Sequence, residues 1–568
     1  FMQKVDLLVS EINRLIVEGK IKNKVELAKA KLRISEKLGL SEIPTNPDIL
    51  AKLVNPSNEA KAILSIKPLR TLSGVAPIAI MTKPWRCPHG TCIYCPGGIG
   101  SPFGDVPQSY TGHEPATMRG VSNNFESYLQ ALNRITQYYA TAHYPEKIEL
   151  IIMGGTFPAM PVEYQYNFVL NAFKALNDFS EWFFEPNFNE AKFNEFLQGS
   201  KASSENWKSK MLRNRSNECS VEALQREHLR NEVAKTKIVT MCVETKPDWC
   251  KESHIDHMLE LGTTRVELGV QTLDNNVLKF TNRGHTLYDT IEATRLLKDS
   301  GLKVTYHFMP GQPLSSKEND IRMLRELFEN DDYKPDGLKI YPCMVMPGTA
   351  LAKLYEKGKF EPLSTDEAAE IIAEAKRYFP EYTRIYRVQR DIPVKFSLSG
   401  VDKNNLRQII EKKCVEKGIK CRCIRCREIG INRAKKIKES KLDFVERHYT
   451  ASRGSEVFIS FEDVSNDLLI GFCRLRIPYK PFRKEFTDST AVIRELHVFG
   501  AQLGLGKKSP DSEQHKGYGQ MLVMRAEQIA KDDFGMDKML VISGVGAREY
   551  YKRKLGYNKE GPYMAKFL

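Results

Sequence analysis

The chain has 568 residues and a formal net charge of +14, and 41% of its residues are hydrophobic. These values are typical of a globular protein of roughly three or four domains, and the excess of basic residues favours a polyanionic partner, nucleic acid above all. No apolar run is long enough to span a bilayer and no signal peptide is recognisable, so we expect a cytoplasmic protein without membrane association. The chain has twelve cysteines, several of them in two clusters, and without such a signal this pattern indicates metal sites and argues against a disulfide scaffold.

Residues 1–70 alternate basic and apolar side chains at helical spacing. This pattern predicts a small basic helical domain. Two roles remain open for this domain. It binds RNA, or it is a helical cap whose basic face is exposed to solvent.

Residues 71–384 alternate short β-rich runs with amphipathic helical stretches, which predicts parallel βαβ units. The expected strands are 77–81, 148–153, 238–243, 265–270, 303–308 and 338–342. Six such units predict a partial TIM-like (β/α)6 barrel, and the polar stretch from about 183 to 230 is expected to be a helical insertion. Unusual polar residues follow the strand ends, where the chemistry of such barrels lies.

Three cysteines, Cys87, Cys92 and Cys95, follow the first expected strand. Three thiolates can hold three irons of a [4Fe–4S] cluster and leave the fourth iron open for S-adenosylmethionine (SAM). The alternative is a zinc site that lacks one nearby ligand. The motif resembles that of the radical-SAM superfamily, with one extra residue in its first gap. After the second strand, Gly154, Gly155 and Thr156 resemble the stretch that binds the SAM amino group there; Glu244 and Gln271 complete the predicted SAM site.

The basic segment 385–445 holds a second cluster, Cys421, Cys423 and Cys426. Three close thiolates form a natural structural zinc site that needs one more ligand. We expect Cys343, after the sixth strand, as the fourth ligand, with Cys414 as the alternative. Free thiols are the remaining interpretation.

Residues 446–568 form a mixed α/β pattern, with strands expected at 457–461, 468–476, 491–499 and 538–543 and a helix from Gly519. Gln514, Gly517 and Gly519 resemble the pyrophosphate turn of the GNAT acetyltransferases, where glycines and a helix N-terminus receive a pyrophosphate. Tyr550 and Tyr551 lie where such enzymes place a tyrosine that protonates the CoA thiolate, and their alternative is a place in the core. The predicted acetyl-CoA site comprises Glu495, Leu496, His497, Val498, Gln514, Gly517, Tyr518, Gly519, Gln520 and Tyr551.

The whole order of motifs resembles the family of Elongator catalytic subunits, which modify the wobble uridine of tRNA. The matching stretches include residues 108–112, 281–285, 386–393 and 541–546. The resemblance implies an α/β fold in which a partial TIM-like (β/α)6 radical-SAM barrel is joined to a C-terminal GNAT α/β domain and a small N-terminal helical domain. It also implies that Lys147 of the barrel contacts acetyl-CoA.

This resemblance further implies that a 5′-deoxyadenosyl radical activates the acetyl methyl group for addition to uridine C5, so that hydrolysis leaves 5-carboxymethyluridine. The tRNA anticodon stem-loop is then the partner, and the candidate contacts are Arg387, Arg390, Lys435, Lys436 and Lys438. No accessory Elongator subunits are expected if the chain is archaeal or bacterial, and a homo-oligomer stays open. The rival functions are a protein lysine acetyltransferase with a structural cluster, and a tRNA-binding scaffold.

Overall fold

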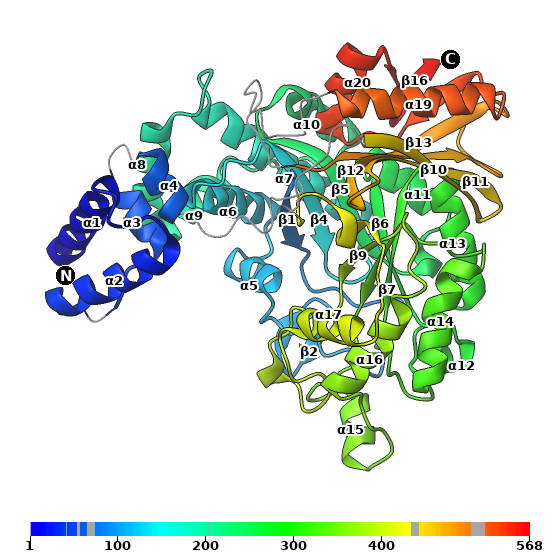
Figure 1. Cartoon of the computed structure of the whole chain (residues 1–568), viewed down its shortest axis with the longest axis horizontal. Helices are drawn as coiled ribbons and strands as arrows, with labels where there is room; N and C mark the ends of the chain where they lie inside the picture. Colours follow the sequence, from blue (N-terminus) through cyan, green and yellow to red (C-terminus); the bar gives the residue numbers. More distant parts are fainter. Residues whose placement is uncertain are drawn as a thin grey trace.

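The computed structural model describes residues 2–40, 42–53, 57–64, 74–202, 204–432, 442–500 and 517–568. Four helices of the N-terminal region lie at one side of the molecule, drawn in blue in Figure 1. They are α1 (Met2–Val17), α2 (Lys24–Leu38), α3 (Asn46–Lys52) and α4 (Asn58–Leu64). Their apolar side chains form a separate core that includes Leu8, Ile12 and Leu27. The predicted helical character of this region is confirmed.

The central sheet consists, within the described residues, of seven parallel strands in the order β1-β4-β5-β6-β7-β8-β9. Because β1 and β9 are both edges, the sheet forms a partial barrel, as expected. The strands are β1 (Ala76–Met81), β4 (Lys147–Met153), β5 (Lys237–Thr245), β6 (Arg265–Gln271), β7 (Lys303–Phe308), β8 (Gly337–Ile340) and β9 (Arg384–Arg387). The first six match the expected strands within three residues at either end. The seventh, β9, was not predicted, because four residues rich in arginine carry no apolar pattern.

Strand β4 shows why the barrel is hollow. Its residues alternate between half-exposed and buried: Ile148, Leu150 and Ile152 are buried in the main core, whereas Lys147 and Glu149 line a cavity inside the barrel. Successive side chains of a strand point to opposite faces. The apolar face therefore packs outward on the helices, and the charged face is left inside, where closed barrels are normally filled with branched apolar side chains.

Helices cover the outer face of the sheet (Figure 1). Those that follow the strands are α6 (Ser127–Ala140), α7 (Val162–Phe183), α10 (Val221–Val233), α11 (Glu252–Glu260), α13 (Leu287–Asp299), α14 (Lys317–Glu329) and α16 (Thr365–Ala375). The expected insertion contains α8 (Glu190–Ala202), α9 (Ser204–Leu212) and α10, so it is helical. Shorter elements are β2 (Gly98–Ser101), β3 (Gly104–Val106), α5 (Pro115–Ser122), α12 (Asn275–Phe280), α15 (Ala350–Glu356), α17 (Leu406–Glu416) and α18 (Ile424–Arg427).

The C-terminal region forms a second sheet in the order β10-β11-β12-β13-β14-β16-β15, in which β13 and β14 are parallel and the other pairs antiparallel. Its strands are β10 (Leu442–Ala451), β11 (Gly454–Asp463), β12 (Leu468–Ile477), β13 (Thr490–Val498), β14 (Lys538–Val541), β15 (Asn558–Glu560) and β16 (Tyr563–Phe567). Helices α19 (Tyr518–Asp532) and α20 (Arg548–Leu555) accompany it. Strand β10 begins at Leu442, before residue 446, at which the C-terminal domain was expected to start. The other expected domain boundaries remain predictions.

The second sheet lies at the amino-terminal ends of the barrel strands (Figure 1). Buried ion pairs join it to the barrel. Arg494 of β13 donates two hydrogen bonds of 2.7 Å to Asp336, which precedes β8. Arg476 of β12 contacts Asp299 at 2.6 Å, and all four side chains are at most 3% exposed. The same buried network contains Lys298, Lys303, Glu456, Arg474 and Glu495. Charged groups that are this deeply buried must be paired, so the network fixes how the two domains meet.

No helix in the described part of the chain is both long enough and apolar enough to cross a membrane.

Candidate active site

The first cysteine cluster lies in the loop after β1, at the carboxyl edge of the barrel. Cys92 is buried and Cys87 and Cys95 are partly buried. Each sulfur has a polar neighbour: the backbone N–H of Ser109 donates to Cys95 Sγ at 3.1 Å, Arg283 donates to Cys92 Sγ at 3.6 Å, and Thr156 Oγ1 lies 3.7 Å from Cys87 Sγ.

These surroundings fit an iron–sulfur cluster. Burial raises the pKa of Cys87, and it raises that of Cys95 to about 11, so the free thiols are protonated at neutral pH. Thiolates are needed to bind iron, and they are stabilised by the metal and by hydrogen bonds to sulfur. Arg283 and the Ser109 N–H provide such bonds. The residues present would therefore hold a [4Fe–4S] cluster through three cysteines.

The predicted SAM-binding residues surround this loop. A Cβ atom on Gly154 would lie 1.9 Å from Thr82 Oγ1, and one on Gly155 would lie 3.8 Å from Cys87 Sγ, so the glycine turn passes directly beside the cysteines. Gln271 has a left-handed φ of 72°, a strained conformation for a non-glycine residue. Its Oε1 atom is buried and accepts no hydrogen bond among the described residues. Such an orphaned acceptor in the cavity fits a ligand with N–H or O–H donors.

The predicted acetyl-CoA residues lie on β13 and at the start of α19. Strand β13 continues to Val498, but its pairing with β14 stops at Ile493 and Val541. A bulge in the pairing with β12 falls between Arg474 and Leu475. The two strands therefore separate next to the N-terminus of α19, which Gly517 caps with a φ of 85°. Tyr518, Gly519 and Gln520 form the first turn of α19, and Gln514 lies outside the described residues.

Of the two candidate tyrosines, Tyr550 is partly exposed and Tyr551 is buried in the main core. A Cβ on Gly519 would lie 3.0 Å from the Tyr550 hydroxyl, so this glycine leaves room for the ring. Burial raises the pKa of Tyr550 to about 12 and that of Tyr551 further, and both hydroxyls therefore carry their protons at neutral pH. Each can act as a proton donor to a thiolate, and the two lie side by side with ring centroids 5.4 Å apart.

One cavity of about 1390 Å³ joins these groups. At the carboxyl edge it is lined by Cys87, Cys92, Gly155, Thr156, Glu244 and Gln271. At the amino edge it is lined by Lys147, by residues 495–498 of β13, by Gly517, Gly519 and Gln520, and by Tyr550 and Tyr551. The cysteine loop and the N-terminus of α19 thus lie at opposite ends of the barrel and are joined by the cavity in its interior.

Glycines of the C-terminal domain permit this close docking. A Cβ on Gly544 would lie 2.0 Å from the backbone oxygen of Val239 on β5, and one on Gly546 would lie 2.5 Å from Cβ of Lys237. Lys147, at the start of β4, is paired with Lys237 in the sheet and faces the same cavity. Lys147 therefore lies at the edge where the acetyl-CoA domain meets the barrel.

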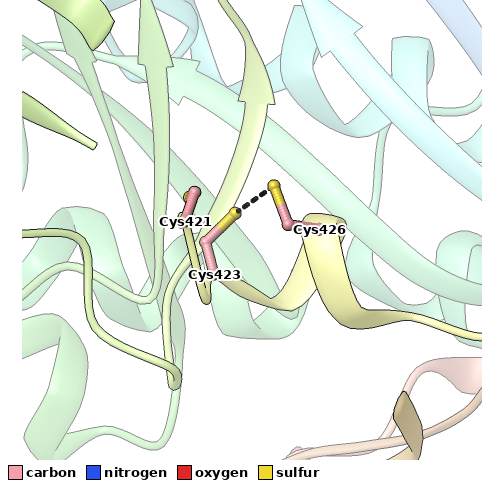
Figure 2. A group of neighbouring side chains, drawn as sticks. All are labelled: Cys421, Cys423 and Cys426. Atoms are coloured by element: carbon pink, nitrogen blue, oxygen red, sulfur yellow. Dashed lines mark hydrogen bonds between the residues drawn. The ribbon is translucent and has the colours of Figure 1, made fainter. Parts of the chain in front are cut away.

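In space, the second cysteine cluster lies between strands β9 and β12. The sulfur atoms of Cys421, Cys423 and Cys426 lie within 4.8 Å of one another, and those of Cys423 and Cys426 are 3.6 Å apart (Figure 2). Figure 2 shows the three side chains converging from the segment that ends in α18. Three thiols that converge in this way fit a tetrahedral zinc ion that takes one further ligand.

The expectation that Cys343 is the fourth ligand is wrong. Cys343 is buried beside Cys92 and Tyr94, under the first cysteine loop. The chain turns back at the end of β8, so Cys343 stays at the carboxyl edge of the barrel. Cys414 of α17 lies nearer to the triad, because Cys414 and the three cysteines all act on one neighbour, Lys376. Burial alone would lower the pKa of the Lys376 ammonium group, but the four cysteines together raise it.

The predicted tRNA contacts are only partly described. Arg387 is paired with Asp391, and Arg390 donates to the backbone oxygen of Ser109. Both line the cavity at the β9 edge, and Arg119 and Arg134 line it near β1. The unpaired edges of the partial barrel therefore carry arginines on both sides. Lys435, Lys436 and Lys438 lie outside the described residues.

Family models match four parts of the chain: the ELP3 N-terminal domain (residues 5–72), the radical SAM superfamily (214–327), the radical SAM C-terminal domain (335–416) and the acetyltransferase (GNAT) family (428–557). The chain is 47% identical to the tRNA uridine(34) acetyltransferase of Methanocaldococcus jannaschii, over 100% of this chain and 99% of that protein. It is 38% identical to Elongator complex protein 3 of Homo sapiens, over 99% and 97%.

The chain belongs to the Elongator protein 3 family. The archaeal Elp3 of Methanocaldococcus infernus with an N-terminal deletion (1–46) superposes with a TM-score of 0.71 at 43% identity, covering 87% of this chain and 100% of that one. The radical-SAM and GNAT domains of this family imply an iron–sulfur cluster, SAM and acetyl-CoA. The predicted fold class is confirmed.

Several site residues were not predicted individually. Gln108 Oε1 accepts the backbone N–H of Cys87 at 2.6 Å, Arg283 contacts Cys92, and the Tyr110 hydroxyl donates to Glu244 at 2.7 Å. All three lie in stretches whose resemblance to the Elongator protein 3 family is visible in the sequence. Their roles depend on contacts across 21 to 191 positions of chain, which no local pattern shows.

Proposed function

We propose that this chain converts the wobble uridine of tRNA to 5-carboxymethyluridine, with SAM and acetyl-CoA as co-substrates. The observation that carries the proposal is the single cavity that runs from the cysteine loop to the pyrophosphate turn. A lysine acetyltransferase with a structural cluster would need no such passage between the two sites. The relatives named tRNA uridine(34) acetyltransferase support the same substrate.

A [4Fe–4S] cluster held by Cys87, Cys92 and Cys95 would supply the electron that cleaves SAM and so provide the 5′-deoxyadenosyl radical. Overall, one acetyl methyl C–H bond and the C5–H bond of uridine are replaced by a carbon–carbon bond, with SAM consumed as the oxidant. Hydrolysis of the thioester then leaves the carboxylate and free CoA.

The chain's own residues bind and orient these molecules. Gly155 and Thr156 offer backbone and hydroxyl groups beside the cysteines, next to Gly154, and Glu244 and Gln271, at the ends of β5 and β6, line the same cavity. Residues 495–498 and the N-terminus of α19 would hold the pantetheine and pyrophosphate of acetyl-CoA. Tyr550 or Tyr551 would return a proton to the CoA thiolate.

The arginines at the edges of the partial barrel, Arg119, Arg134, Arg387 and Arg390, supply positive charge where an anticodon stem-loop would enter. The wobble base must leave its stack to reach the interior, as enzymes that act on bases require. Zinc bound by Cys421, Cys423 and Cys426 would tie the segment after β9 together, with no open position for catalysis if Cys414 is the fourth ligand.

The test is an anaerobic assay of the cluster-loaded protein with reductant, SAM, tRNA and acetyl-CoA deuterated in the methyl group. We expect deuterium in 5′-deoxyadenosine and carboxymethylated uridine in the tRNA. Acetylated lysine without 5′-deoxyadenosine would instead favour the protein acetyltransferase. SAM that is not cleaved at all would favour a tRNA-binding scaffold.

A further inference from the structure

A histidine–carboxylate pair lines the cavity inside the barrel and has no role in the function proposed above. His307 of β7 contacts Glu267 of β6, with Nε2 and Oε2 2.8 Å apart. Glu267 is fully buried, whereas the His307 side chain is 15% exposed and lines the cavity. Lys339 of β8 and Arg265 also contact Glu267, one on each carboxylate oxygen.

This environment determines which nitrogen of His307 carries the proton. Burial alone would raise the pKa of Glu267, but Lys339, His307 and Arg265 hold it well below its usual value, so the carboxyl group is ionised. An ionised carboxylate only accepts hydrogen bonds, and Nε2 must therefore donate. In the neutral ring, Nδ1 then holds the free lone pair. Nδ1 makes no hydrogen bond within the described residues, so it is available to a molecule in the cavity.

We propose that His307, oriented by Glu267, is the general base that activates water to hydrolyse the thioester after the acetyl group has joined uridine. This inference rests on the function proposed above. Nδ1 takes a proton from water while the water oxygen bonds to the carbonyl carbon. The carbon–sulfur bond then breaks, CoA leaves as a thiolate, and the imidazolium returns the proton to this thiolate, directly or through a tyrosine. The products are CoA and the carboxylic acid, which loses its remaining proton to solvent and becomes the carboxylate.

The position of His307 suits this step. The thioester carbonyl carbon is bonded to the methyl carbon that joins uridine, so hydrolysis must occur where that methyl group reacts, inside the barrel. Lys303, four residues before His307 on β7, contacts Glu495 of the acetyl-CoA strand at 2.9 Å. At about 3.3 Å per residue, His307 lies about 13 Å further along the strand. Met309, two residues beyond it, packs in the cluster that contains Cys92.

The other histidine in the cavity is a poorer base. His497 of β13 also lines the cavity, beside the acetyl-CoA strand. Burial lowers its pKa to about 4, so it is a weak proton acceptor at neutral pH. Its ring stacks on that of Phe472, with the ring centroids 6.0 Å apart.

Polar and charged groups of the surrounding strands lie around this pair. Glu244 of β5 lies near the His307 ring, and Tyr341, just after β8, packs edge-on against it. Lys339 of β8 and Arg265 of β6 contact Glu267. Oxygens of Glu244 and Glu267 lie within 4.8 Å of a His307 nitrogen, which is close enough for a shared metal ion. Lys339 and Arg265 already occupy both oxygens of Glu267, and these cations argue against a further positive ion.

The experiment compares His307→Gln with the wild type and with His448→Gln, which changes an exposed histidine on β10. Glutamine can still donate a hydrogen bond to Glu267 but has no basic nitrogen. In single-turnover assays with methyl-deuterated acetyl-CoA, we expect His307→Gln to form deuterated 5′-deoxyadenosine at a rate near that of the wild type. CoA release should fall by about 100-fold or more, the range of general-base effects, and tRNA that still carries CoA should accumulate.

The possible outcomes separate the two proposals. If the wild type forms no carboxymethyluridine, the proposed function fails. If the wild type does form it and His307→Gln releases CoA equally fast, the general base is another group. Loss of 5′-deoxyadenosine in His307→Gln would also overturn the inference, because His307 would then serve SAM or uridine binding. Dependence of CoA release on an added divalent cation, abolished in His307→Gln, would make His307 a metal ligand instead.

A second readout does not depend on catalysis. In cluster-free protein with ¹⁵N-labelled histidine, the signals of the neutral His307 ring should show a proton on Nε2 and a lone pair on Nδ1. Assignment follows from the signals that His307→Gln removes. A proton on Nδ1 would overturn the proposed tautomer and with it the base that faces the cavity.

Discussion

Replacement of Asp336 by asparagine tests whether the buried ion pairs hold the acetyl-CoA domain on the barrel. Asp336 accepts two hydrogen bonds of 2.7 Å from Arg494 and one of 2.9 Å from the Val304 N–H. Lys298 lies 3.5 Å and Arg474 3.6 Å from it. Asparagine keeps the shape but removes the charge that neutralises these cations.

The expected loss follows from the burial of the network. Removal of one partner of a buried ion pair costs about 3–5 kcal/mol, because the other charge is left without compensation. Glu456 still pairs with Arg494 at 2.7 Å, so we expect a value near the lower limit, about 3 kcal/mol. At about 1.4 kcal/mol per factor of ten, domain docking should weaken by about 100-fold.

Hydrogen exchange of the cluster-free protein measures this effect locally. Peptides from β13 should exchange faster in Asp336→Asn, whereas peptides from α1, which packs in the separate N-terminal core, serve as an internal reference. The matched control is Asp331→Asn, which removes an exposed ion pair with Lys334 and should cost at most about 1 kcal/mol. Equal exchange of β13 in the two variants would refute the view that buried charges hold the domains together.

Three further predictions concern pH, zinc and tRNA. Burial alone would raise the pKa of Glu495, but Lys303 and Arg474 lower it from 4.5 to about 2. The contribution of Glu495 to domain docking is therefore complete above pH 4.5 and should disappear as the pH falls towards 2. Hydrogen exchange of β13 measured as a function of pH checks this, and Glu495→Gln should remove that part of the pH dependence. Cys423→Ser should lower the zinc content, measured by elemental analysis, by about one ion per chain, whereas Cys343→Ser should not; equal loss in both would restore Cys343 as a ligand. The double variant Arg387→Gln, Arg390→Gln should bind tRNA more weakly. The slope of the logarithm of the binding constant against the logarithm of the salt concentration should become shallower by about 0.9 for each lost phosphate contact. An unchanged slope would show that these two arginines do not contact the tRNA phosphates.

Local patterns in the sequence were sufficient for much of this protein. Short β-rich runs that alternate with amphipathic helical stretches predicted six barrel strands, since this alternation is typical of parallel βαβ units. The spacing of Cys87, Cys92 and Cys95 predicted one metal site and that of Cys421, Cys423 and Cys426 another, because ligands of one ion or cluster that are close in sequence need little of the fold to converge.

Contacts between distant parts of the chain could not be derived in this way. The sequence does not show that Cys343 lies under the first cysteine loop, that β9 completes the sheet, or that Glu267 orients His307 from 40 positions away. Each depends on which strands become neighbours and on which side chains face inward. The amino-acid sequence by itself therefore determined most of the helices and strands, the cofactor motifs and the family. The tertiary structure decided that the two domains share one cavity lined by charged residues. The physical reason is that this cavity is enclosed only when the second sheet packs on the amino edge of the barrel.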